Sequence, residues 1–165
     1  MATLRLRADS YFDGALHHAT NEGPYLIAIE NGRIAAIDPR AAEAPFDRQA
    51  AFVMPGLVEA HAHLFLDGGD LDFERRNAYL NASIDEMLKV ARENVARNAA
   101  AGVTLVRDAG DRYGVNDAIR DEQRGKRVAV RSPGLGVKRP KRYGGFMARD
   151  IEPGGDVASV VADMA

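Results

Sequence analysis

The sequence contains no cysteine among its 165 residues. Disulfide bonds, thiolate metal sites, iron–sulfur clusters and a cysteine nucleophile are therefore all excluded. Any bound metal ion must be held by histidine, by a carboxylate or by a modified lysine.

Long apolar runs and a strong net charge are also lacking. No apolar stretch reaches the length of a bilayer, and the first residues alternate apolar and basic side chains without the apolar segment of a signal peptide. The formal net charge is only −2, which favours neither nucleic acid nor an anionic membrane as a partner. We therefore expect a cytoplasmic protein with no nucleic-acid or membrane partner. Its 46% of hydrophobic residues are enough for a folded core.

Two common functional motifs are missing as well. The chain has neither the Gly-x-Ser-x-Gly pattern of a serine nucleophile nor a phosphate-binding P-loop. Gly134-Leu135-Gly136 is half of a dinucleotide fingerprint, but it lacks the third glycine, a following helix and an acidic ribose partner. Serine-nucleophile and nucleotide-dependent functions therefore lose their usual support.

What the sequence does contain is a histidine pair at the end of an apolar run. Residues 52–58 have the composition of a buried strand, and Pro55-Gly56 supplies a turn that delivers the chain into it. Because side chains alternate along a strand, His61 and His63 should point the same way. Two such imidazoles can share a divalent cation, although core histidines bonded to the backbone would give the same spacing.

The stretch from Pro55-Gly56 through Glu59 to His61 and His63 resembles the first-strand signature of the amidohydrolase superfamily of metal-dependent hydrolases. The resemblance implies that these two histidines bind one or two divalent metal ions, with zinc as the first candidate. Further ligands and a proton-transferring aspartate would come from later strands, so no catalytic residue is expected in this chain. The family usually has aspartate where Glu59 stands, and the longer side chain would shift any contact with the metal ligands.

The residues before this stretch have the pattern of short strands. Residues 25–30 and 33–37 are two apolar runs joined by Asn31-Gly32, a dipeptide suited to a two-residue hairpin turn. Residues 40–51 show no regular pattern. We expect residues 1–51 to form a small antiparallel β unit, which in the resembled family belongs to a β-sandwich.

After His63 the pattern changes to alternating helices and strands. Residues 66–82 are polar and mixed, as in a long loop. Ser83 and Glu86 have the spacing of a capping box, and the helical apolar period that follows ends before Gly102. The remaining expected elements are strands at 103–106 and 128–130, a helix at 115–124, and the start of a helix at 156–164 with Asp156 as its cap.

These elements make up only part of an eight-stranded barrel. Three parallel strands alone would leave two unpaired edges and bare apolar surface. We therefore predict an α/β fold: a β-sandwich unit over residues 1–51, then the first three strand–helix units of a (β/α)8 barrel over residues 52–165. The remainder of the barrel would come from a second chain or from a missing segment, and a homo-oligomer is left open. The chain alone is expected to be inactive.

A basic segment follows the second predicted helix. No acidic residue occurs between Gln123 and Asp150. The loop at 132–146 either grips an anionic group of a substrate or is simply a solvated loop. Arg107 and Asp108, at a strand end, either contact substrate or form an ion pair that shapes the loop. The candidate substrate-binding residues are Arg107, Asp108, Arg131, Lys138, Arg139, Lys141, Arg142 and Tyr143.

The resemblance implies hydrolysis of a C–N bond by metal-bound hydroxide. The small-molecule substrate would be a cyclic amide, an N-acyl amino acid or a dipeptide, and a functional basic segment would favour one that bears a carboxylate. A heterocycle deaminase of the same superfamily is an alternative. A non-catalytic barrel relative that binds an anionic ligand is another.

Overall fold

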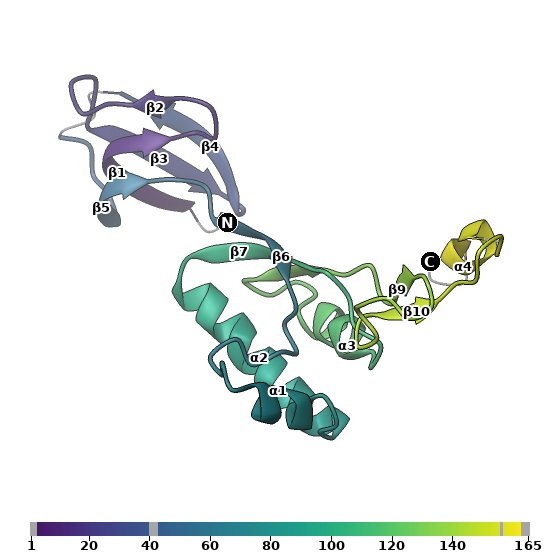
Figure 1. The fold of residues 1–165 in the computed structure, drawn as a ribbon. Helices are drawn as coiled ribbons and strands as arrows, with labels where there is room; N and C mark the ends of the chain where they lie inside the picture. The colour runs from purple at the N-terminus through teal and green to yellow at the C-terminus, as the bar shows by residue number, and fades with distance from the viewer. Residues whose placement is uncertain (1–2, 40–42, 156, 163–165) are drawn as a thin grey trace. The chain divides into compact units, whose positions relative to one another are not determined.

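The computed structural model describes residues 3–39, 43–155 and 157–162 (Figure 1). The chain divides into two compact units, Met1–Pro55 and Gly56–Ala165. Within the described residues, no helix is both long and apolar enough to cross a membrane.

The first unit is built on one five-stranded sheet. Its strands are β1 (Thr3–Phe12), β2 (His17–His18), β3 (Tyr25–Glu30), β4 (Arg33–Asp38) and β5 (Arg48–Val53). β1 pairs antiparallel with β2 and with β3, and β3 pairs antiparallel with β4. β5 pairs with β1 in the parallel direction, so the sheet is mixed.

The prediction of a purely antiparallel unit is therefore wrong for β5. This strand lies partly in residues 40–51, for which no element was predicted, and it also contains Phe52 and Val53, which were expected to begin the histidine strand. Its partner β1 lies about 40 residues earlier in the sequence, at Leu6↔Arg48 for example. Pairing over such a separation leaves no local signal, because local patterns report only on near neighbours.

The predicted hairpin between β3 and β4 is confirmed. Asn31 and Gly32 have φ angles of 52° and 75°, the left-handed values that a two-residue turn of this kind requires. Ala8, Tyr25 and Ile27 are buried and form the apolar centre of this unit.

The second unit contains three parallel strands in the order β6-β7-β8. They are β6 (Leu57–Ala62), β7 (Val103–Asp108) and β8 (Ala129–Arg131), joined through α2 (Ile84–Ala100) and α3 (Val115–Glu122) (Figure 1). The predicted alternation of strands and helices is confirmed, while the closure of a barrel requires strands beyond these three.

Helix α2 has the predicted start and end. The Ser83 hydroxyl accepts the Glu86 N–H at 3.3 Å, and the Glu86 carboxylate accepts the Ser83 N–H at 3.0 Å. Gly102 follows the helix with a φ of 85°.

Full burial of an apolar side chain contributes about 1.5–3 kcal/mol. The core includes Leu64, Phe65, Met87, Ala91, Val95, Val106, Ile119 and Val130.

The loop predicted at residues 66–82 contains a helix, α1 (Phe73–Tyr79). Asp72 caps it by accepting the Arg75 N–H at 2.9 Å. The prediction failed because α1 buries no residue and so lacks an apolar stripe. Its aspartate N-cap was the available signal.

The basic segment also contains structure that was not predicted. β9 (Gly136–Lys138) pairs in parallel with β10 (Ala148–Asp150). The last described helix is α4 (Val157–Ala162). The proposed cap Asp156 and the end of the predicted helix at 163–164 lie outside the described residues.

The start of the histidine strand is not buried as predicted. Leu57 is 46% exposed and Val58 is 58% exposed. β6 is an edge strand of its sheet, and α2 packs against α3 and β7, so the described part of the second unit covers these side chains only partly.

Candidate metal and substrate site

The histidine pair lies at the end of β6. His61 belongs to the strand and His63 follows one residue after its last residue. Their ring centroids are 5.5 Å apart and the ring planes are nearly perpendicular, at 82°. The rings therefore lie next to each other, as expected from side-chain alternation. His61 is exposed and His63 is partly buried.

The tautomer of His63 follows from one hydrogen bond. Its Nδ1 lies 3.0 Å from the carbonyl oxygen of Gly110. A carbonyl can only accept, so Nδ1 carries the proton and donates it, which leaves the lone pair on Nε2. Metal-binding histidines commonly use this arrangement, in which a backbone carbonyl or carboxylate holds the ring nitrogen that does not bind the metal. The donor set thus fits a divalent metal ion.

The pair by itself is an incomplete site. Across residues 3–39, 43–155 and 157–162, no group of three or more histidine and acidic side chains is placed to hold a metal ion. Two imidazoles supply half of a four-coordinate zinc site. The resemblance implies further ligands on strands beyond β8.

Asp108, at the end of β7, organises the backbone around the pair. Its carboxylate accepts the Leu64 N–H at 2.9 Å through Oδ2 and the Gly110 N–H at 2.8 Å through Oδ1. The Ala109 N–H also donates to the Ala62 carbonyl at 2.7 Å. Asp108 therefore connects the segment after β6 to the residue whose carbonyl orients His63.

This role differs from the substrate contact predicted for Asp108. Its side chain is fully buried, and both carboxylate oxygens accept backbone N–H groups. Burial raises the pKa of the Asp108 carboxyl, while the two backbone hydrogen bonds act in the opposite direction. Arg107 is exposed on the same strand, and the described residues show no ion pair between the two.

Glu59 contacts the backbone of its own strand. Its Oε1 accepts the N–H of His61 at 2.9 Å. In the described residues, the carboxylate at this position therefore supports the strand that carries the histidines.

The cations of the basic segment differ in their surroundings. Lys138 forms a close ion pair with Asp150, while Arg139, Lys141 and Arg142 are exposed, as is Arg131 on β8. The binding of an anionic substrate group by this loop stays a prediction. Lys138 and Arg139 both line another hollow.

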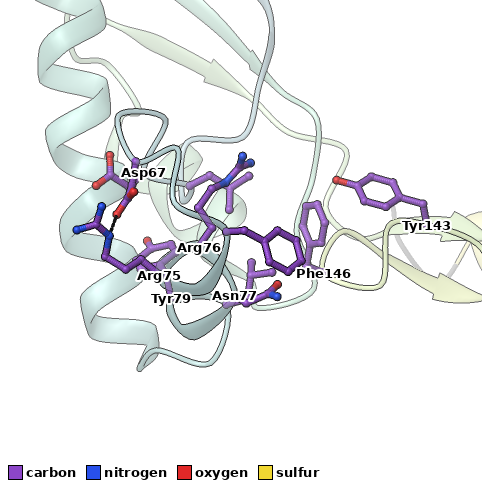
Figure 2. Close-up of a pocket in the computed structure, with 11 residues that line it drawn as sticks. Asp67, Arg75, Arg76, Asn77, Tyr79, Tyr143 and Phe146 are labelled. Atoms are coloured by element: carbon purple, nitrogen blue, oxygen red, sulfur yellow. Dashed lines mark ion pairs between the residues drawn. The ribbon is translucent and has the colours of Figure 1, made fainter.

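A pocket of about 460 Å³ lies close to the pair and includes Tyr143 from the predicted loop (Figure 2). Its two guanidinium groups come from Arg75 and Arg76 of α1, which the sequence analysis did not identify as site residues. Phe146 lines the same pocket, and its ring centroid is 6.3 Å from that of His63. In the sequence, these site residues were indicated only by two adjacent arginines that follow an aspartate N-cap.

Comparison with known proteins adds independent information. No protein-family model matches the chain. Imidazolonepropionase of Paenarthrobacter aurescens (strain TC1) is 30% identical over 124 residues, which cover 63% of this chain and 30% of that protein. Adenine deaminase of Desulfatibacillum aliphaticivorans is 40% identical over 38 residues, 23% of this chain and 7% of that protein.

Solved structures share the fold. A prolidase complexed with N-methylphosphonate-L-proline matches 99% of this chain and 44% of its own, with a TM-score of 0.65 and 18% identity. Ochratoxinase of A. niger matches 98% of this chain and 44% of its own, with a TM-score of 0.64 and 17% identity.

Together the comparisons point to the amidohydrolase superfamily, the family whose signature the histidine stretch resembles, and this prediction is confirmed. The match to imidazolonepropionase covers 63% of this chain. The chain spans 30% of that enzyme and 44% of the prolidase.

Proposed function

We propose that this chain carries the first metal ligands of a hydrolase that cleaves C–N bonds, and that β6, β7 and β8 are the first strands of its (β/α)8 barrel. The observation that carries the proposal is the pair of neighbouring imidazoles, His61 and His63, at a strand end, with the His63 tautomer set by Gly110. The similarity to imidazolonepropionase, to adenine deaminase and to solved structures of molinate hydrolase and phenylurea hydrolase B supports the same class of reaction.

The residues of this chain would act by holding and orienting. His63 presents Nε2 because its Nδ1 proton is donated to Gly110, and Asp108 holds that glycine by its N–H. A divalent cation, zinc first among them, would lower the pKa of a bound water and polarise the substrate carbonyl. Proton transfer is assigned to an aspartate on a later strand, outside this chain.

Metal binding by the pair can be tested in this chain. Zn²⁺ is titrated while the imidazole nitrogens are followed by NMR. We expect saturable shifts at Nε2 of His61 and His63, both lost in His61→Ala and in His63→Ala. His17→Ala is the matched control, because His17 lies in the first unit. Shifts that persist in either single variant would refute the pair as a metal site.

Turnover is then assayed on a protein in which the barrel is complete. Cyclic amides, N-acyl amino acids and dipeptides are the substrates to screen. We expect activity to require metal and to disappear in His61→Ala. Activity that survives complete removal of metal would contradict the proposal.

A heterocycle deaminase is the second candidate, and the match to an adenine deaminase favours it. Deamination releases ammonia from a ring, whereas amide hydrolysis creates a new carboxylate, so product analysis separates the two. A non-catalytic protein would keep its affinity for an anionic ligand in His61→Ala while showing no turnover.

A further inference from the structure

The pocket beside the histidine pair is formed by α1, by the turn that precedes it, and by the loop that carries Tyr143 and Phe146 (Figure 2). A volume of about 460 Å³ lies within the range of small-molecule sites, roughly 300–1,000 Å³. The Arg112 N–H donates to the Phe146 carbonyl at 3.0 Å, which fixes one wall to the segment after β7.

The walls are aromatic. Phe73 is 75% exposed and Tyr143 is 84% exposed, and both line the pocket. Tyr143 and Phe146 meet edge to face, with ring centroids 5.6 Å apart. Exposed rings gathered around one hollow are typical of a binding site, whereas single exposed rings carry no such meaning.

The two guanidinium groups at the pocket differ in their partners. The Arg75 Nε lies 3.0 Å from a carboxylate oxygen of Asp70, and Figure 2 shows this pair by a dashed line. Arg76 extends in a different direction, and among the described residues no carboxylate lies within 4.0 Å of it. The nearby Asp67 accepts the Gly69 N–H at 3.0 Å. Arg76 is therefore the cation that remains for a ligand.

The pocket adjoins the proposed metal site through Phe146. The ring of this residue contacts both the pocket and the ring of His63, at a centroid distance of 6.3 Å from the latter. Phe146 therefore belongs both to the wall of the pocket and to the surroundings of His63.

We propose that this pocket binds a substrate group that consists of an aryl or similar apolar body ending in a carboxylate. The body packs against Phe73, Tyr143 and Phe146, and the carboxylate pairs with Arg76, whose planar guanidinium suits a carboxylate. This assignment rests on the proposed function, because it takes the histidine pair as the reaction centre.

The test titrates two probes of equal shape into this chain without metal: 3-phenylpropanoate and its neutral amide, 3-phenylpropanamide. We expect the carboxylate to bind about tenfold more tightly or better, since charge-assisted hydrogen bonds are roughly twice as strong as neutral ones. Arg76→Gln should remove this preference and leave the binding of the amide unchanged. Arg127→Gln is the matched control and should keep the preference, because Arg127 is exposed and does not line the pocket.

Equal binding of acid and amide by the unmodified chain would overturn the proposal, and so would a preference that survives Arg76→Gln. If Arg76→Gln binds neither probe, Arg76→Lys decides: a retained preference for the acid supports the pocket, and its loss overturns it. Because no metal is present, failure here leaves the histidine pair intact as a metal site. Conversely, if His63→Ala did not weaken Zn²⁺ binding, the metal site would be refuted, but the result of the probe titration would be unchanged.

Discussion

Asp108 is the residue at which substitution should most affect the histidine segment. Its carboxylate accepts two backbone N–H groups, from Leu64 and from Gly110, and all three residues are buried. Asp108→Asn keeps the shape of the side chain. The single amide oxygen can still accept from one of the two donors, but the NH₂ group then faces the other.

The cost follows from the number of donors left without a partner. An unsatisfied buried donor costs about 1–3 kcal/mol. Asp108→Asn should therefore lower the free energy of unfolding of the second unit by about 1–3 kcal/mol. Asp108→Ala removes the acceptor for both N–H groups and should cost roughly 2–6 kcal/mol on the same basis.

The assay is urea unfolding followed by the helical circular dichroism signal, because the described helices all belong to the second unit. Amide hydrogen exchange at Leu64 and Gly110 gives a local readout, and both should exchange faster in the variants. Asp85→Asn, an exposed carboxylate on α2, is the control and should stay within about 0.5 kcal/mol of the unmodified chain. Unchanged stability and unchanged exchange in Asp108→Ala would refute the role of this carboxylate.

Three further predictions concern local features. The backbone N–H of Leu16, with His18 and the Ala15 N–H, lowers the pKa of Asp13 to about 2. This carboxylate therefore stabilises the fold above about pH 4 and loses that effect as the pH falls toward 2. The melting temperature of Asp13→Asn should vary less across this range, and the same pH dependence in both proteins would contradict the assignment. Gly56→Ala would place a Cβ 2.2 Å from the Thr104 side chain and should lower the free energy of unfolding in urea by about 1–3 kcal/mol. Gly68→Ala is the control, because no atom lies within 4 Å of its Cβ, and equal effects of the two substitutions would refute the steric argument. Ser83→Ala removes the cap of α2 and should cost about 1 kcal/mol by the same assay, and no change would mean that the capping box contributes nothing.

Features that depend on neighbours within a few residues could be predicted from the sequence. The capping box at Ser83 joins residues three apart, and the Asn31-Gly32 turn needs only two residues with positive φ. The histidine pair belongs to the same group, because alternation along a strand brings His61 and His63 to one side. These local rules also carried the prediction of parallel strands joined by helices.

Features that depend on distant pairing required the tertiary structure. Nothing in the sequence near β5 indicates that it pairs with β1, and α1 lacks the apolar stripe that reveals a helix. Anion binding was predicted for the loop that is rich in lysine and arginine, whereas the arginines that line the aromatic pocket are Arg75 and Arg76 of α1.

The sequence by itself determined the class of the site: two neighbouring imidazoles at a strand end, in a chain that has no thiolates. Only the tertiary structure decided how that site is held, because Asp108 meets Leu64 across 44 residues and Gly110 meets His63 across 47. Side-chain chemistry and short-range geometry depend only on residues that are close together in the sequence. Which carbonyl orients a ring, and which arginine faces the pocket, is decided by segments that become neighbours only on folding.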